Sequence, residues 1–145
     1  MRRALARPFP RSALPTSPPD VVGLEPEPLH ALAYVSTPTG PFSDRDLSDL
    51  LLSARSWNAQ HGVTGKLLVL EDDDGDVVQF AQWIEGAPDP LAACLDRIHA
   101  DPRHQLGEVQ RHGAVAGRRF PGWDMAFESA TGVAFGAQAR ALQTP

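Results

Sequence analysis

The chain has little of what several kinds of protein are built from. Its 145 residues include a single cysteine, Cys94, which has no second cysteine for an internal disulfide and suits a reducing compartment. No run of about 18 apolar residues is present, so we expect no membrane-spanning segment. The formal net charge of −5 argues against non-specific nucleic-acid binding, which needs a basic surface. We therefore expect a cytoplasmic domain with neither a membrane nor a nucleic acid as partner.

Further absences argue against an enzyme or a metal protein. No two of the five histidines lie four residues apart, the spacing with which a helix binds zinc. No glycine-rich phosphate loop is present. A hydrolase would require a catalytic Arg–Asn pair at a loop–helix junction, and we do not expect one at Asn58, which lies at a helix end. We expect Cys94 to be a core residue, because it lies on an apolar helical stripe.

The first part of the chain differs in composition from the rest. Residues 1–28 hold seven of the fourteen prolines and four arginines, with no acidic residue before Asp20. Such a stretch cannot bury enough apolar surface to fold. We predict a disordered arm, or residues that follow an upstream start codon, although the composition also resembles an organelle transit peptide.

The rest of the chain shows alternating strand and helix patterns. We predict elements at 29–36 (strand), 43–60 (helix), 63–71 and 76–85 (strands), 89–100 (helix), 107–116 and 123–128 (strands). This order predicts an α+β fold, a ferredoxin-like β-α-β-β-α-β sandwich with an additional fifth strand and the helices on one sheet face. The domain would span 29–128, and a short C-terminal tail, 129–145, would hold one helix around 134–142.

Local signals mark the ends of these elements. Ser43 followed by Asp46 is a capping-box variant that begins the first helix, and Gly62 fits its end. Asp89 followed by proline predicts an N-cap and first-turn proline for the second helix. The acidic stretch 72–76 predicts a hairpin tip, with Gly75 available for a positive φ.

Periodicity places six residues on one buried pocket. They are Tyr34, Ser36, Asn58, Gln82, Trp123 and Met125. Strict alternation puts the first two on one face of their strand and surrounds the Gln82 amide with apolar side chains. Asn58 continues the apolar stripe of the first helix, so it faces inward. Alternation in the last strand puts Trp123 and Met125 on the same side.

This set favours a polar ligand over catalysis of bond cleavage. An unpaired buried amide costs about 1–3 kcal/mol, so Gln82 and Asn58 need each other, the backbone or a ligand as partners. Each amide taken alone could satisfy a local backbone group. Several polar residues in one core favour a bound ring with several donors and acceptors. The set offers neither a nucleophile nor paired carboxylates.

The chain resembles a BLUF domain, the flavin-binding module of blue-light sensors, over residues 29–128. The similarity is carried by five segments in the family's order, 33–36, 57–65, 80–86, 101–104 and 118–125. The resemblance implies non-covalent FAD, or FMN or riboflavin in its place. It also implies blue-light sensing without enzymatic turnover, with signalling through a homo-oligomer or an unidentified downstream protein.

The resemblance also implies residue roles. Tyr34 and Gln82 would be the photoactive pair, whose hydrogen bonds to the flavin rearrange in light. Trp123 and Met125 would form a mobile final strand that responds to this change. The remaining residues implied to bind the flavin are Ser36, Leu50, Asn58, Ile98, Asp101, Arg103 and His104. Of these, Asn58 would hold the carbonyl edge of the flavin, and Leu50 and Ile98 would clamp its ring.

The sequence departs from the family pattern in three places. The hairpin between the second and third strands is longer and acidic, Lys66 stands where a small or apolar residue is common, and Trp57 replaces a histidine or amide. The charged end of Lys66 must reach water or find a partner. The alternative hypothesis is a BLUF-like interaction module that has lost flavin binding or photoactivity.

Overall fold

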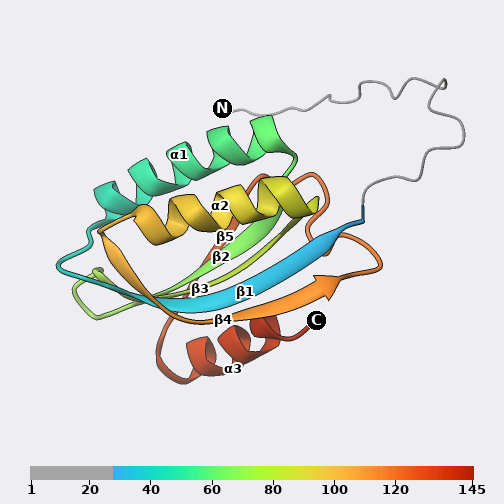
Figure 1. Ribbon diagram of the computed structural model, residues 1–145. Coiled ribbons are helices and arrows are strands. Elements are labelled where there is room, and N and C mark those ends of the chain that lie inside the picture. The colour runs from blue at the N-terminus through green and yellow to red at the C-terminus, as the bar shows by residue number, and fades with distance from the viewer. Residues whose placement is uncertain (1–27) are drawn as a thin grey trace, which may run out of the picture.

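The computed structural model describes residues 28–145, which form a five-stranded sheet with helices on both faces (Figure 1). The elements are β1 (His30–Pro38), α1 (Asp44–His61), β2 (Thr64–Glu71), β3 (Val77–Gly86), α2 (Pro88–Ala100), β4 (His104–Ala114), β5 (Ala126–Ala130) and α3 (Gly132–Gln143). The order confirms the predicted ferredoxin-like α+β fold with a fifth strand. The predicted arm, 1–28, lies outside the described residues except for its last residue.

The sheet places the two candidate photoactive residues side by side at its centre. Its strand order is β4-β1-β3-β2-β5. β1 and β3 are antiparallel neighbours, and their register pairs Tyr34 with Gln82. β5 lies at the edge beside β2, to which it runs parallel. Because paired residues in neighbouring strands point to the same face, both side chains lie on one side of the sheet.

Each face of the sheet has its own core. The helices α1 and α2 cover one face, as predicted, and the side chains of Tyr34 and Ile84 belong to that core. The third helix, α3, covers the opposite face (Figure 1). Its buried Phe135 and Leu142 pack against a second cluster that includes Trp83. β3 therefore alternates between two buried environments, with even-numbered residues from Phe80 facing α1 and α2.

The predicted ends of α1 are confirmed and the predicted start of α2 is wrong. Ser43 and Asp46 form a reciprocal capping box, and Gly62 closes α1 with a φ of 69°. Ala87, not Asp89, occupies the N-cap of α2, and its side chain makes no cap hydrogen bond. Pro88 begins the helix, so Asp89 lies in the first turn, where the helix dipole favours a carboxylate.

The boundaries predicted for the last two strands are also wrong. β4 begins at His104, which pairs with Pro38 of β1, rather than at residue 107. β5 begins at Ala126 rather than at residue 123. A tight turn delays β5, because Trp123 N donates to Phe120 O at 3.1 Å.

The prediction that the charged end of Lys66 needs water or a partner is confirmed. Lys66 finds a partner, Glu128 of the neighbouring β5, at 2.5 Å. Both side chains are partly exposed, so the pair lies at the surface of the sheet edge. Within residues 28–145, no helix combines the length and apolar character that crossing a bilayer requires.

Candidate functional site

A chain of buried hydrogen bonds joins three of the predicted residues. Tyr34 Oη donates to Gln82 Oε1, and Gln82 Nε2 donates to Met125 Sδ at 3.2 Å. All three side chains are buried. The phenol and the thioether thus fix both ends of one amide, because its oxygen accepts and its nitrogen donates.

Asn58 holds the segment next to Met125 from the side of α1. Its Nδ2 donates to Asp124 O at 2.7 Å, and its Oδ1 lies 3.7 Å from Cys94 Sγ. Asn58 faces inward, as predicted, and part of its hydrogen-bonding capacity is met by backbone. Arg55, which the sequence analysis did not select, donates from Nε to Met125 O at 3.0 Å. Its spacing of three residues from Asn58 places both on one helix face and could have indicated it.

His104 connects β1 to the end of α2. Its Nε2 lies 3.0 Å from Ile98 O and its Nδ1 lies 2.9 Å from Ser36 Oγ. Because a carbonyl can only accept, Nε2 carries the proton of this contact. Tyr34 meets the same imidazole edge-on, with ring centroids 6.4 Å apart. The structure therefore brings Ser36 and His104 to the same side of the sheet as the Tyr34 phenol.

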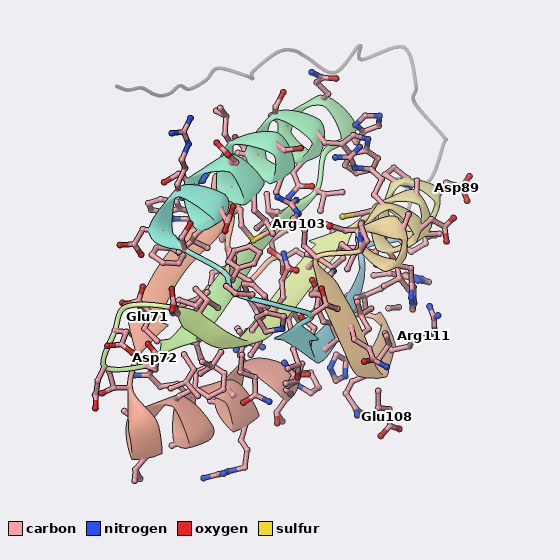
Figure 2. All side chains as sticks on the ribbon, turned by 90° about the vertical axis from the view of Figure 1, so that its left-hand side faces the viewer. Glu71, Asp72, Asp89, Arg103, Glu108 and Arg111 are labelled. Carbon is pink, nitrogen blue, oxygen red and sulfur yellow. The ribbon has the colours of Figure 1, made fainter. Side chains whose placement is uncertain are left out.

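The other implied flavin-binding residues surround this group. Leu50 on α1 and Ile98 on α2 are partly buried and pack against the same core as Tyr34. Arg103 Nη2 and Asp101 Oδ2 form an ion pair at 2.7 Å. The hydrogen bonds that the Arg103 side chain donates to this carboxylate lower the pKa of Asp101. Arg103 lies between the α1 and α2 sides of the molecule in the view of Figure 2.

Burial controls the protonation of the two weak acids in this core. Burial is the main cause of the raised pKa of Tyr34, so its phenol stays neutral at ordinary pH. Burial also raises the pKa of Cys94 to about 12. The Tyr34 phenol and the Cys94 thiol are therefore uncharged in this core, which suits a polar but uncharged aromatic ring beside them.

The prediction that Trp123 lines this pocket is wrong. Its side chain is 58% exposed, whereas Met125 is 1% exposed. Both residues precede β5, and the turn that ends at Trp123 breaks the strict alternation on which the prediction depended. Met125 enters the core and Trp123 remains outside it.

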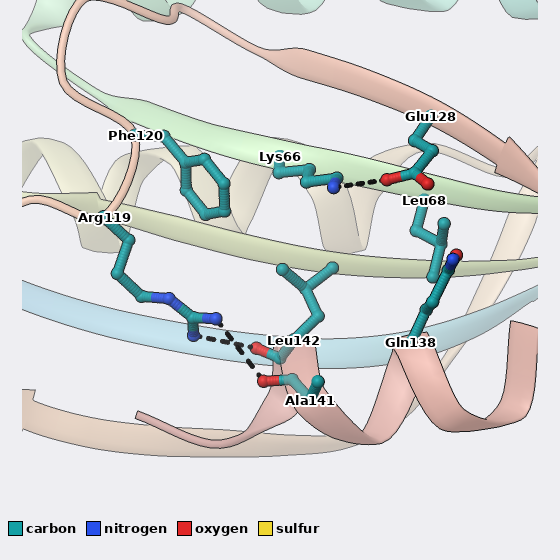
Figure 3. Close-up of a pocket in the computed structure, with 8 residues that line it drawn as sticks. All are labelled: Lys66, Leu68, Arg119, Phe120, Glu128, Gln138, Ala141 and Leu142. Atoms are coloured by element: carbon teal, nitrogen blue, oxygen red, sulfur yellow. Dashed lines mark hydrogen bonds and ion pairs between the residues drawn. The ribbon is translucent and has the colours of Figure 1, made fainter.

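A separate cavity of about 310 Å³ lies on the α3 face of the sheet (Figure 3). Its lining residues are Lys66, Leu68, Arg119, Phe120, Glu128, Gln138, Ala141 and Leu142. None of the predicted site residues belongs to this lining. The sheet separates it from the Tyr34 phenol, because α3 and α1 cover opposite faces.

The comparisons with known proteins agree with this geometry. Residues 29–126 match the model of the BLUF family, described as sensors of blue light using FAD. The match covers most of the chain, and the chain belongs to the BLUF family of blue-light sensors. Photoactivated adenylate cyclase subunit beta of Euglena gracilis is 38% identical over 76 residues, which are 52% of this chain and 8% of that protein. The chain thus spans a small part of this curated relative.

Solved structures show the same fold. The dark-state structure of the BLUF protein BlrB has a TM-score of 0.60 and 30% identity, covering 71% of this chain and 74% of that chain. BlrP1 of Klebsiella pneumoniae, solved with FMN and cyclic diGMP, has a TM-score of 0.56 and 27% identity, covering 81% of this chain and 31% of that chain. BLUF domains bind flavin, and the residues brought together here belong to such a domain.

Proposed function

We propose that this chain senses blue light through a non-covalently bound flavin held between the sheet and the helices α1 and α2. The observation that carries the proposal is the buried hydrogen-bond chain from Tyr34 through Gln82 to Met125. A glutamine between a phenol and a thioether can reverse its amide without breaking any covalent bond. Such an arrangement suits a switch better than an enzyme.

The donors and acceptors present fit a flavin. Each primary amide offers two N–H donors and an oxygen with two lone pairs, so Asn58 and Gln82 keep capacity beyond their present contacts. These two amides would bind the polar edge of the ring. Leu50 and Ile98, on the two helices, would contact its faces. We propose FAD as the cofactor, with FMN or riboflavin able to replace it, and the FMN bound by BlrP1 supports this range.

The remaining implied residues would bind the flavin where its side chain leaves the ring. Asp101, Arg103 and His104 follow α2 directly, and His104 reaches back to Ser36. The Arg103–Asp101 ion pair holds a guanidinium at this end of the site. A guanidinium suits the phosphate of FMN or FAD.

Light would change the Tyr34–Gln82 hydrogen bond. A bound flavin excited by blue light supplies a strong oxidant. Tyr34 would give an electron to this oxidant, and its phenolic proton would move along the hydrogen bond to Gln82 Oε1. When both return to Tyr34, Gln82 would remain with its amide rotated or in a different tautomer. New hydrogen bonds from that amide to the ring would shift the flavin absorption to the red.

Met125 would carry the change out of the site. Met125 Sδ can accept from an N–H but cannot donate, so a rotated Gln82 amide loses this contact. The segment before β5 then has a different arrangement in light and dark. We propose that the output is self-association or binding to a downstream protein.

One observation favours the alternative, an interaction module without flavin. Trp57 stacks on His61 with ring centroids 3.8 Å apart, and the Arg97 guanidinium lies 5.1 Å from the Trp57 ring centroid. Trp57 therefore ties α1 to α2, the two helices between which the flavin would lie. Close contacts of this kind would narrow the space between α1 and α2 that a flavin needs.

Flavin content and photochemistry separate the two functions. The purified chain is denatured and the supernatant is chromatographed for FAD, FMN and riboflavin. We expect a yellow protein whose absorption shifts reversibly to the red in blue light and recovers in darkness. A colourless protein that also refuses each added flavin would establish the alternative.

A further inference from the structure

We infer that Glu85, a buried carboxylate on the face of β3 that α3 covers, is a positioning residue for Met125. The inference rests on the proposed function for its effect on photochemistry, but its structural part stands alone. Glu85 is 0% exposed, although carboxylates are rarely buried without partners. It lies three residues after Gln82 on β3, so the two side chains point to opposite faces of the sheet.

Four hydrogen bonds converge on the Glu85 carboxylate. Arg119 N and Trp83 Nε1 donate to Oε1 at 2.8 and 2.9 Å. Phe120 N and Thr64 Oγ1 donate to Oε2 at 2.9 and 2.8 Å. Each Glu85 oxygen thus accepts from one main-chain N–H, and the two N–H groups belong to the successive residues Arg119 and Phe120. Hydrogen bonds to a charged acceptor are stronger than neutral ones, so this contact fixes the backbone at 119–120.

A hydrogen-bonded turn connects this anchor to Met125. Trp123 N donates to Phe120 O at 3.1 Å, and Gly122 between them has a φ of 80°. Proline at the second position and a positive-φ glycine at the third are typical of a type II turn, which Pro121 and Gly122 satisfy. Trp123 O then accepts from Gly65 N of β2 at 3.2 Å. Only Asp124 separates this contact from Met125.

The other end of the segment is held on the opposite face of the sheet. Asn58 and Arg55 bind the carbonyls of residues 124 and 125, and Gln82 binds the Met125 sulfur. The segment 119–125 therefore passes from the α3 face to the α1 face between two sets of contacts. Glu85 holds the start of this segment through two main-chain N–H groups. Gln82 contacts its end through the Met125 sulfur. A displaced start moves the thioether relative to the Gln82 amide.

Arg119 offers a control that separates this role from the packing of α3. Its guanidinium donates to the carbonyls that end α3, at 2.8 Å to Thr144 O and at 3.4 Å to Ala141 O and Leu142 O (Figure 3 draws the last two). Its main-chain N–H donates to Glu85 independently of the side chain. Arg119→Gln thus removes the contact with α3, together with the stacking of the guanidinium 4.3 Å from the Trp83 ring centroid, and keeps the main-chain N–H that donates to Glu85.

The first test reads Met125 without any need for light or flavin. The chain has two methionines, Met1 and Met125. The full chain is labelled with ¹³C at the methionine methyl groups and measured by NMR. The signal that Met125→Leu removes is the signal of Met125. In Glu85→Gln one carboxylate oxygen becomes an NH2 group, which faces a main-chain N–H of residue 119 or 120. Because both groups are donors, the hydrogen bond is lost, and we expect the Met125 signal to shift or broaden. Arg119→Gln is expected to leave it in place. If Glu85→Gln does not fold, Thr64→Val removes one of the four bonds, together with the hydrogen bond from the Arg118 guanidinium to Thr64 Oγ1 at 2.8 Å, and is expected to give a smaller shift.

The second test measures the dark-recovery rate after blue light. We expect Glu85→Gln to change it by at least about threefold, and the same substitution to have no effect in a Met125→Leu background, because coupling requires both residues. An unmoved Met125 signal in both Glu85→Gln and Thr64→Val would overturn the inference. An equal kinetic effect with and without Met125 would overturn it as well. A wild-type protein without photochemistry would refute the proposed function, while the Met125 signal would still decide the role of Glu85.

Discussion

Gln143 Nε2 donates to the main-chain carbonyl of Tyr34 at 3.1 Å. This contact links the last residue of α3 to the strand that carries the buried phenol. The register of β1 against β4 shifts between Tyr34 and Ser36, and a shifted register interrupts the ladder of backbone hydrogen bonds. His112 Nε2 also lies 2.8 Å from Gln143 O, so β4 holds the same residue.

Gln143→Ala is expected to lower the free energy of unfolding by about 1 kcal/mol, because the Tyr34 carbonyl loses a side-chain donor. Urea unfolding followed by circular dichroism measures this change. Gln138→Ala, an exposed glutamine of the same helix, is the matched control and should change stability little. Equal effects of the two substitutions would show that helix propensity, rather than the contact with Tyr34, sets the loss.

Gln82→Leu and Tyr34→Phe are each expected to abolish the light-induced red shift while the flavin stays bound. Leucine keeps approximately the volume of glutamine but has no amide to reverse, and phenylalanine has no phenolic proton. Difference spectroscopy under blue light, with flavin content measured in parallel, checks both variants. Met125→Ala should retain the shift and weaken its transmission. A full shift in Gln82→Leu would refute the amide switch.

The Cys94 thiol is expected to resist alkylation in the folded protein. Burial raises its pKa to about 12, so the reactive thiolate is scarce at pH 8. Iodoacetamide labelling followed by mass spectrometry should be slow in buffer and rapid in denaturing urea. The raised pKa also means that stability from this group is present below about pH 9 and is lost as the pH rises toward 12. Rapid labelling of folded protein would contradict the buried position.

Shortening the acidic hairpin is expected to leave the fold and flavin binding nearly unchanged. Asp72 organises the tip within itself, since its Oδ1 accepts from the main-chain N–H groups of Asp74 and Asp76 at 3.0 Å. Figure 2 shows Glu71 and Asp72 on the opposite side of the molecule from Asp89 at the start of α2. Each halving of loop length changes the closure entropy by only about 0.6 kcal/mol.

Replacement of residues 72–76 by Asn-Gly tests this expectation through the urea midpoint and the flavin content. Gly65→Ala is the destabilising reference, because a Cβ there would collide with Trp83 O. A shortened variant as unstable as Gly65→Ala would show that the hairpin supports the domain. Loss of flavin with intact stability would show instead that the tip contributes to the binding site.

Several features of the fold and the site could be predicted because they are encoded locally. Alternation in β1 and β3 placed Tyr34 and Gln82 on the covered face, and helical spacing placed Asn58 inward. Ser43 and Gly62 marked the ends of α1, because capping depends on a few neighbouring residues. The element order then indicated the ferredoxin-like sandwich, since few sheet topologies fit it.

Other features depended on contacts between residues far apart in the chain. The exposure of Trp123 follows from a turn that ends in a hydrogen bond to β2, and periodicity within one segment carries no information about such a partner. Glu85 resembles any other polar residue at a strand end until the backbone of residues 119 and 120 reaches it. The face that α3 covers was likewise undetermined by its short apolar pattern. The sequence specified which residues of β1, β3 and α1 turn inward. Only the tertiary structure decided which of them meet and what the segment before β5 does, because long-range hydrogen bonds and packing join segments that local periodicity treats separately.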